Sequence, residues 1–468
     1  MSETETLFAG LRQSADGKIV DLLERMVREA PDHALNKINA LEVAKKEGVD
    51  EERVIATLLN AVSVGMFEMT WNVMCPSCAG VLSANKSLKT LDRTQYKCAF
   101  CAAGYETTLD NLVEVTFTVS PRLRKIAAHN PDGLSAAEYY RQIFWSSAID
   151  LPGDPERVLG EVTLDMVELP AGERAILSLH APKGTLIVFD PVTHSAQFIE
   201  VSGEETAERQ NLAISFNKVQ TPADTVVLRP GPLRLSLDNR TDGRVLPAVW
   251  VANQALDDIL TRRKPVLTAT RLLTNQTFRD LYRTDTLAIG QRLKILSLTF
   301  LFSDLKDSTE LYERVGDLTA FDLVNEHFRL LQEIIASERG AVVKTIGDAI
   351  MATFETPDRA ISAAIRMREA MSDLGAERQH QSLRLKMGIH EGSCLAVTLN
   401  GQQDYFGQTV NVASRVQGLA ASRSIVVTEQ VVENAQARTL LESNGLKPTP
   451  RRVALTGIAD KVSVYEIS

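Results

Sequence analysis

Four cysteines arranged as two CxxC pairs place the strongest constraint on how this chain folds. Cys75 and Cys78 form the first pair, Cys98 and Cys101 the second, and nineteen residues separate the pairs. This spacing is typical of a four-thiolate zinc site, in which two turns supply tetrahedral ligands. Disulfide bonds are the alternative, and they belong to oxidising compartments. We predict structural zinc, because four protein thiolates leave no coordination position open for catalysis.

The composition is that of an ordinary globular protein with room for two to four cores. The chain has 468 residues, 44% of them hydrophobic and 24% charged, and a formal charge of −9. That charge argues against a chain-wide nucleic-acid surface. No apolar run approaches the roughly 18 residues of a membrane span. The acidic N-terminus lacks the features of a signal peptide, so we expect a cytoplasmic protein without membrane or nucleic-acid partners.

Five regions of the sequence differ in residue pattern. Helical periodicity at 18–30, 38–47 and 51–63, followed by an alternating strand-like run, resembles a winged-helix module. The predicted fold class is α+β, with a winged-helix-like helical module (1–66), a zinc ribbon (67–109), a β-rich regulatory or scaffolding domain (110–260), a helical connector (261–292) and a C-terminal ferredoxin-like domain (293–468).

The β-rich region carries short β-prone runs, such as GTLIVFD and LRLSLDN, separated by turn residues. Their spacing predicts a sandwich or a barrel. The region contains no acid pair, nucleophile set or phosphate loop, which favours a sensory, scaffolding or interaction role. The arginine-rich connector that follows either transmits strain between domains or is a plain surface linker.

Residues 293–468 predict a β-α-β-β-α-β order with helices on one face of the sheet, which is the ferredoxin-like arrangement. A long apolar run ends at the polar stretch SDLKDST, and VVKTIGDAIMATF predicts a hairpin. After a helical segment, 383–392 and 393–401 predict a further pair of strands, and a helix begins near Gly407.

Two aspartates stand at strand ends in this last region. Asp304 ends the first strand and Asp348 follows the hairpin turn, and strand neighbours in such a sheet would bring the two carboxylates together. Paired carboxylates suit Mg²⁺, and two such ions can activate an attacking oxygen and neutralise a leaving one. On their own, however, these residues are more simply a pair of solvated strand-end aspartates, and Lys344 with Asp348 a local ion pair.

A third segment, DYFGQTVNVASR, changes that balance. Asn411 and Arg415 fall at i and i+4, on one face of the predicted helix. An amide and a guanidinium so placed can bind a ribose and the charge that develops on a phosphate.

Together these segments resemble the class III nucleotide cyclases, over residues 296–428 and on toward the C-terminus. The resemblance implies that Asp304 and Asp348 bind two Mg²⁺ or Mn²⁺ ions per active site, with the backbone carbonyl of Leu305 as a further ligand. The upstream arrangement of helical module, cysteine ribbon and β-rich region also resembles a group of bacterial cyclases with an uncharacterised N-terminal region.

The same resemblance assigns the nucleotide contacts. Lys344 and Asp404 match the pair that reads adenine, because a lysine can donate to N1 and a carboxylate can accept from the N6 amine. Guanine presents the opposite pattern, so ATP is the expected substrate. Asn411 and Arg415 match the residues that position the ribose and stabilise the transition state.

One loop departs from the family pattern. The stretch of Lys306, Ser308 and Thr309 should cradle the triphosphate, and Asp307 stands where the family usually has glycine. A carboxylate there would repel phosphate, unless Lys306 offsets its charge or the loop is remodelled.

The resemblance therefore predicts an adenylate cyclase that forms cyclic AMP and pyrophosphate at sites shared across a homodimer, under the control of its N-terminal domains. Lys344 would then serve one site of the dimer and Asp348 the other. The alternative is a nucleic-acid-binding or signalling protein that uses a weakly active cyclase fold for dimerisation, with the basic stretch SANKSLKTLDRTQYKC as a contact surface.

Overall fold

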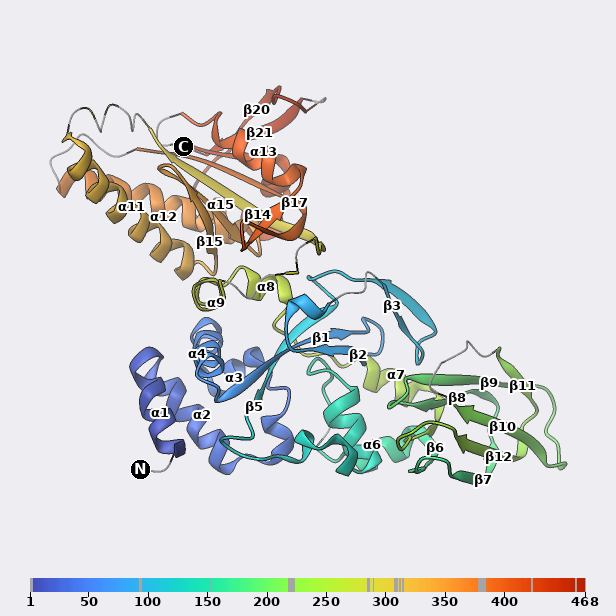
Figure 1. Cartoon of the computed structure of the whole chain (residues 1–468). Helices are drawn as coiled ribbons and strands as arrows, with labels where there is room; N and C mark the ends of the chain where they lie inside the picture. The colour runs from blue at the N-terminus through green and yellow to red at the C-terminus, as the bar shows by residue number, and fades with distance from the viewer. Residues whose placement is uncertain are drawn as a thin grey trace. The chain divides into compact units, whose positions relative to one another are not determined.

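The computed structural model describes residues 3–467, apart from 92–94, 152, 218–223, 284–286, 289, 307–309, 311–312, 314, 378–383, 422–423 and 459–460. These residues form two compact units, which Figure 1 colours from blue to red along the chain. The N-terminal unit comprises 1–86, 93–107 and 112–267, and the C-terminal unit comprises 87–92, 108–111 and 268–468. Of the helices in the described residues, none has the length and apolar composition that crossing a membrane requires.

The N-terminal unit begins with helices whose starts are fixed by side-chain caps. Asp16 accepts hydrogen bonds from Lys18 N and Ile19 N, and Asp50 accepts one from Arg53 N. The three predicted helices are present, and a further helix precedes them; whether they form a winged-helix module stays a prediction. Their bounds are α1 (Glu3–Ser14), α2 (Gly17–Glu29), α3 (Ala40–Glu47) and α4 (Glu51–Ser63), with a short 3₁₀ helix, η1 (Asp32–Leu35), between α2 and α3.

Two hairpins present the cysteine pairs. The first pair lies in the turn between β1 (Phe67–Met74) and β2 (Val81–Asn85), and the second lies in the turn between β3 (Gln95–Cys98) and β4 (Ala103–Glu106). The other edge of β1 pairs with β5 (Val113–Val119), so this strand joins the sheet of the first hairpin. Helical segments then follow: α5 (Ala136–Tyr139), the π-helical turn η5 (Tyr140–Phe144) and α6 (Pro155–Val162).

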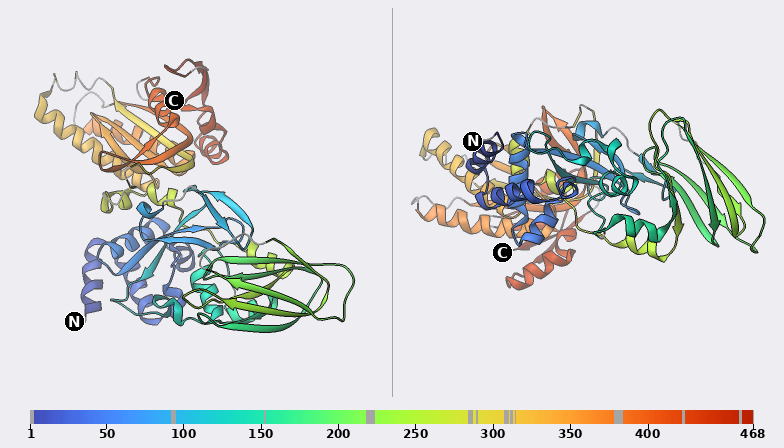
Figure 2. Two further views of the ribbon diagram at one scale, coloured as in Figure 1. Left: turned by 45° about the vertical axis from the view of Figure 1, so that its right-hand side comes forward. Right: turned by 90° about the horizontal axis from the view of Figure 1, so that it is seen from below.

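The β-rich region forms two sheets, drawn in green in Figure 2. One sheet has the order β10-β12-β7 and the other β11-β9-β8-β13-β6. Alternate residues of β12, including Leu235 and Leu237, share a buried core with Val188 and Ile199 of the second sheet, as in a sandwich. The strands are β6 (Thr163–Met166), β7 (Arg174–Ala181), β8 (Gly184–Asp190), β9 (Ser195–Val201), β10 (Gln210–Phe216), β11 (Val226–Leu228), β12 (Gly231–Asn239) and β13 (Ala248–Ala252), followed by α7 (Gln254–Thr261).

The C-terminal unit is built on one large mixed sheet. Its strand order is β15-β16-β14-β17-β19-β21-β20, and the β-α-β-β-α-β order of its first half matches the sequence prediction. The strands are β14 (Leu293–Leu305), β15 (Ala341–Ile346), β16 (Ala349–Phe354), β17 (Leu385–Leu399), β18 (Gln402–Phe406), β19 (Ile425–Thr428), β20 (Thr449–Val453) and β21 (Val462–Ile467). The helices are α8 (Ala269–Leu273), α9 (Gln276–Leu281), α11 (Asp317–Ser337), α12 (Pro357–Glu377), α13 (Gln408–Gln417), α14 (Glu429–Glu433) and α15 (Ala435–Ser443).

Helices cover both faces of this sheet, so the prediction of helices on one face is wrong. Ile425 and Val427 of β19 pack in the core formed with α11, α12 and α15, whereas Val426 between them packs against α13. Side chains of a strand alternate between faces, so α13 lies on the opposite face. Glycine allows this close approach: a Cβ on Gly388 would lie 2.2 Å from Gln417 N, and one on Gly392 would lie 2.8 Å from Thr409 Oγ1.

The predicted strand pair at 383–392 and 393–401 is also wrong. Residues 385–399 form one long strand, β17, which pairs with β14 along its length. The pairing of β14 with β17 shifts register between Ile295 and Leu298 of β14, opposite the middle of β17, where a turn was expected. The chain reverses later, and β18 pairs with the C-terminal half of β17.

Two short segments from the cysteine-ribbon region belong to the C-terminal unit. In residues 108–111, Leu109 N donates to Lys294 O (3.0 Å), and Asp110 Oδ2 accepts from Leu296 N (2.6 Å). In residues 87–92, Leu88 O accepts from Gln291 Nε2 (2.9 Å). Leu88, Leu91 and Leu109 are buried, and both segments belong to that unit.

Candidate functional site

The two predicted metal-binding aspartates lie at one edge of the C-terminal sheet. Asp304 is near the end of β14, which pairs with β16, and Asp348 sits in the two-residue turn between β15 and β16. Gly347, with a φ of 64°, provides the left-handed residue of this turn. Burial and the Asp348 carboxylate raise the pKa of Asp304. The structure therefore brings both carboxylates into one electrostatic site.

Two residues that sequence reasoning missed also act on Asp304. Lys386 is the cross-strand neighbour of Asp304 on β17, and Gln417 at the end of α13 donates a hydrogen bond to its carboxylate. Both lower the pKa of Asp304 and oppose the effect of burial. Only the strand register and the close contact of α13 reveal them, and neither can be read from the local sequence.

Asp348 keeps an unsatisfied oxygen. Its Oδ2 is buried and has no hydrogen-bond partner among the described residues. A buried acceptor without a donor is costly, and two neighbouring carboxylates repel each other. A divalent cation would relieve both effects, and oxygen ligands suit Mg²⁺ or Mn²⁺. The donor set therefore fits the predicted metal.

The predicted base-reading residues are in direct contact. Lys344 Nζ, on β15, lies 2.5 Å from Asp404 Oδ2, on β18. Tyr405 N donates to the other oxygen of the same carboxylate (2.8 Å) and fixes its orientation. Asp404 is buried, whereas the lysine side chain is 40% exposed. The Lys344 ammonium is therefore accessible to a ligand while the Asp404 carboxylate stays buried.

An arginine of the connector holds the two strands that carry this pair. Arg279 of α9 donates from Nε to Val342 O (3.1 Å), and from Nη2 to Val343 O (3.2 Å) and Gln403 O (3.0 Å). These carbonyls directly precede Lys344 and Asp404 or lie within two residues of them. Sequence reasoning noted arginines in the connector but gave Arg279 no role, because its partners are backbone atoms far along the chain.

The remaining predicted residues lie on α13 and in the loop after β14. Asn411 is exposed and Arg415 half-buried on one face of α13, and the Arg415 guanidinium packs against Gly457, where an added Cβ would lie 3.3 Å from Nη2. Leu305 is buried at the end of β14, and Lys306 is half-buried beyond it. Asp307, Ser308 and Thr309 lie outside the described residues.

The four cysteines of the two CxxC pairs converge in the N-terminal unit. All are free thiols, and their sulfurs lie within 4.8 Å of one another. Cys75 Sγ is 3.8 Å from Cys101 Sγ, and Cys78 Sγ is 3.6 Å from Cys98 Sγ. Zn–S bonds of about 2.3 Å in a tetrahedron separate sulfurs by about 3.8 Å, so the cluster has the dimensions of a zinc site.

Both cysteine turns have the same backbone geometry. Ala79, directly after the first pair, has a φ of 53°, and Ala102, directly after the second, has a φ of 50°. Ala79 N also donates back to Cys75 O (2.8 Å), which closes the first turn. Left-handed conformations are uncommon for alanine, so each turn carries an unusual backbone conformation directly after its second cysteine.

Comparison with protein families also divides the chain into an N-terminal and a C-terminal part. Residues 1–280 match a family described as "Family of unknown function (DUF5939)", and residues 293–463 match the "Adenylate and Guanylate cyclase catalytic domain". The second match begins at the first residue of β14 and covers each predicted cyclase residue.

Similar proteins include several cyclases. An adenylate cyclase of Anabaena cylindrica is 31% identical over 185 residues, which cover 36% of each chain. A receptor-type adenylate cyclase of Trypanosoma brucei brucei is 25% identical, and the match covers 36% of this chain and 17% of that protein. The crystal structure of the adenylyl cyclase CyaB from P. aeruginosa has 22% identity and a TM-score of 0.35, over 38% of this chain and 96% of that one. The matches to the two sequence relatives thus span about a third of their length or less.

Proposed function

Because the chain belongs to the DUF5939 family and carries a class III cyclase catalytic domain, we propose that it is an adenylate cyclase, which converts ATP to cyclic AMP and pyrophosphate. The observation that carries this proposal is the contact between Lys344 and Asp404 at 2.5 Å, in the unit that also holds Asp304 and Asp348.

The pair accounts for the choice of adenine. The lysine donates to N1 of the base, and Asp404, held by Tyr405 N, accepts from the N6 amine. Guanine would set its N1–H against the ammonium and its O6 against the carboxylate. A site built from buried polar groups discriminates strongly against a ligand that leaves those groups unpaired.

The protein groups then divide the work of the reaction. Asp304 and Asp348 hold divalent cations, with Leu305 O as a further ligand, and Lys306, Ser308 and Thr309 contact the phosphates. A divalent cation bound there would lower the pKa of the ribose 3′-hydroxyl and offset the negative charge of the phosphates. Asn411 orients the ribose, and Arg415 stabilises the charge that develops at the α-phosphate.

Each active site is completed by a second copy of the chain. Large apolar side chains near the site are exposed, namely Leu318 and Phe321 at the start of α11, Ile346 beside the aspartate turn and Phe406 beyond Asp404. Large apolar side chains left exposed in this number are typical of an interface. In the homodimer, the aspartates of one protomer face the Lys344–Asp404 pair and α13 of its partner.

The cysteine cluster holds a structural zinc ion, and the N-terminal unit that contains it regulates the catalytic unit. The sulfur spacing supports four-thiolate coordination, which leaves no position for a substrate.

Product analysis tests this function. Purified protein is incubated with ATP or GTP in Mg²⁺ or Mn²⁺, and the products are separated by chromatography. We expect cyclic AMP and pyrophosphate from ATP, and little product from GTP. Faster formation of cyclic GMP would refute our assignment of Lys344 and Asp404, and no product from either nucleotide would favour a fold kept for dimerisation.

A further inference from the structure

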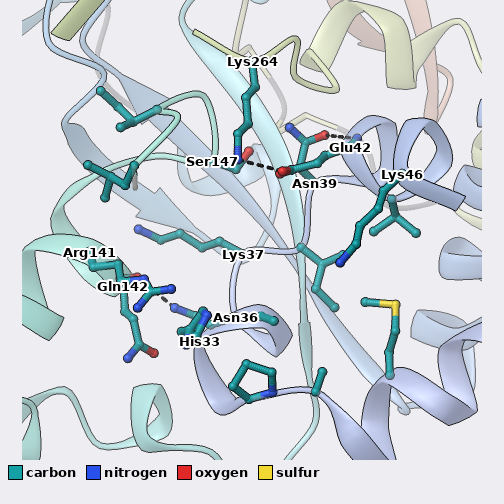
Figure 3. A pocket seen from close by; sticks show the side chains of 18 of the residues that line it. His33, Asn36, Lys37, Asn39, Glu42, Lys46, Arg141, Gln142, Ser147 and Lys264 are labelled. Atoms are coloured by element: carbon teal, nitrogen blue, oxygen red, sulfur yellow. Dashed lines mark hydrogen bonds and ion pairs between the residues drawn. The ribbon is translucent and has the colours of Figure 1, made fainter. Parts of the chain in front are cut away.

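The N-terminal unit contains a cavity of about 620 Å³ (Figure 3). Residues of α2, η1 and α3 line one part of it, the segment 141–151 lines another, and Lys264 completes it. Small-molecule sites in proteins usually measure about 300–1,000 Å³. The cavity is therefore large enough for a metabolite, and none of its residues belongs to the cysteine cluster or to the proposed catalytic site.

The residues that line this cavity carry a net positive charge, whereas the chain as a whole is negatively charged. The described residues that line it include five lysines and arginines against three glutamates, although the whole chain has a formal charge of −9. Burial and the nearby Arg141 lower the pKa of His33, so this ring is neutral near pH 7 and can donate or accept a hydrogen bond. The lining cations are Arg25, Lys37, Lys46, Arg141 and Lys264, and the lining carboxylates are Glu29, Glu42 and Glu47.

Two of these glutamates already have partners. Arg25 pairs with Glu47 (3.0 Å), and Lys264 pairs with Glu42 (2.7 Å), as the dashed line in Figure 3 shows. Arg141 in turn pairs with Glu138 (3.4 Å), which lies outside the lining, so the cationic surface left for a ligand is mainly that of Lys37 and Lys46.

Lys37, at the wall of the cavity, has an uncommon backbone conformation and a hydrogen-bonded ammonium. Its backbone is left-handed, with a φ of 48°, and its Nζ donates to Ile143 O (2.5 Å) and Trp145 O (3.0 Å). An ammonium has three donors, so one remains for a ligand. Burial lowers the pKa of Lys37 to about 8. Strained residues of this kind persist where the surroundings fix them, and they gather at binding sites.

Hydrogen bonds between separate segments fix the shape of the cavity. Asn36 Nδ2 donates to Gln142 O (2.8 Å), and Asn39 Nδ2 donates to Pro265 O (2.8 Å). In Figure 3 the Lys37 side chain extends toward Arg141 and Gln142, whereas Lys46 and Lys264 lie on the side of Glu42. Apolar side chains of Leu22, Met26 and Val43 also line the space. The cavity is thus preformed and offers both cationic and apolar surface.

We propose that this cavity binds a small organic anion, whose phosphate or carboxylate group is held by the lining lysines and arginines and whose uncharged body lies on the apolar residues. This binding does not depend on cyclase activity, so a failure of one proposal would leave the other untouched.

Affinity labelling locates such a site directly. Pyridoxal 5′-phosphate, an anionic aldehyde, is added to the full-length protein, its imines are reduced with borohydride, and the labelled lysines are mapped by mass spectrometry. Pyridoxal, which lacks the phosphate, is the matched reagent. We expect the phosphate to accelerate labelling of Lys37, Lys46 or Lys264 about tenfold more than it accelerates labelling of the exposed Lys45, because pyridoxal, which closes to a hemiacetal, reacts more slowly with every lysine. One charge-assisted hydrogen bond would give such a factor. Protection by inorganic phosphate would identify a phosphate ligand, and protection by citrate a polycarboxylate.

A neighbouring lysine provides the control. Lys45 lies beside Lys46 on α3 and is exposed, but it does not line the cavity. Lys46→Gln should weaken protection at the other cavity lysines, and Lys45→Gln should leave it unchanged. Both substitutions are on the surface and spare the fold. An acceleration at every cavity lysine no greater than that at Lys45, or labelling that neither anion reduces, would overturn the proposal.

Discussion

The cysteine cluster and the nucleotide site differ in how completely the chain's own atoms fill them. In the cluster, four sulfurs lie within 4.8 Å of one another and three of the four cysteines are buried. In the nucleotide site, Asp348 Oδ2 is buried without a partner among the described residues, and Asn411 is exposed. The first site is closed by its own sulfurs, whereas the second is open and leaves polar groups available to a ligand.

This difference separates the effects expected from mutation. Breaking the proposed zinc site should remove folding energy, because the binding free energy of a structural metal contributes to folding. Breaking an open site removes interactions that form with the substrate, so the protein should stay folded and lose rate. Four experiments test this contrast.

The largest effect is expected at the open site. Asp348→Ala removes a metal ligand and Arg415→Ala removes a transition-state contact, and loss of one such contact typically lowers the rate about 10²–10³-fold. Each mutant homodimer should therefore be nearly inactive. In a mixed dimer one site collects both defects and the other is intact, so mixing the two inactive proteins should restore cyclic AMP formation.

A second mixture controls for this rescue. Asp304→Ala and Asp348→Ala damage the same half of the site, so every site in their mixed dimer is defective and activity should stay at background. Subunit exchange is verified with differently tagged chains. If exchange occurs and the first mixture also stays inactive, the sites are not shared between protomers.

The next effect is at the closed site. Cys98→Ser removes one of four thiolates, and we expect the loss of about one zinc ion per chain. The free energy of unfolding of the N-terminal unit should also fall by several kcal/mol, because metal binding is coupled to folding. Metal analysis and calorimetry measure both. Cys394→Ser, at a buried cysteine outside the cluster, is the matched control and should leave the zinc content unchanged. Freshly prepared wild-type protein without zinc would contradict the assignment.

A smaller effect is expected where α13 meets the sheet. Gly388→Ala places a Cβ 2.2 Å from Gln417 N, so α13 must shift and carry Asn411 and Arg415 with it. Overpacking of this kind costs about 1–3 kcal/mol. Stability and kcat should both fall. Gly160→Ala, on a helix where nothing lies within 4 Å of the added Cβ, should have no such cost. Unchanged kcat in Gly388→Ala would show that α13 does not position the catalytic residues.

The smallest effect concerns the connector. Arg279→Lys cannot bridge the three carbonyls that the guanidinium joins, so the Lys344 and Asp404 strands should loosen. We expect the preference for ATP over GTP to fall about fivefold, the equivalent of one ordinary hydrogen bond, mainly through KM. Arg283→Lys, at an exposed arginine nearby, is the control. An unaltered nucleotide preference would limit Arg279 to a role in stability.

The contrast between the sites also explains what the sequence could predict. The cysteine cluster is formed by two short turns, so the spacing of Cys75, Cys78, Cys98 and Cys101 was sufficient to predict that the thiols meet. The nucleotide site draws on β14, β15, β18 and α13, and its residues could be paired only through the family resemblance. Lys386 and Gln417 were missed because register and helix packing bring them to Asp304.

The errors in the fold have the same origin. Apolar runs identified the strands, but a run gives neither the face that a helix covers nor the point where a strand reverses. The position of α13 depends on Gly388 and Gly392, whose missing side chains leave no signal in hydrophobic periodicity. Likewise β17 continues through Gly392, a residue that local rules read as a turn.

The segments 87–92 and 108–111 determine how far this protein can be treated as modular. They lie more than 170 residues before the cyclase domain, yet Leu88, Leu91 and Leu109 are buried within the C-terminal unit. A gene fusion that joined residues 293–468 to another N-terminal domain would remove the hydrogen-bond partners of Lys294 O and Leu296 N. Exchange of regulatory domains, in evolution or in engineering, would therefore have to carry the cysteine ribbon along with the cyclase.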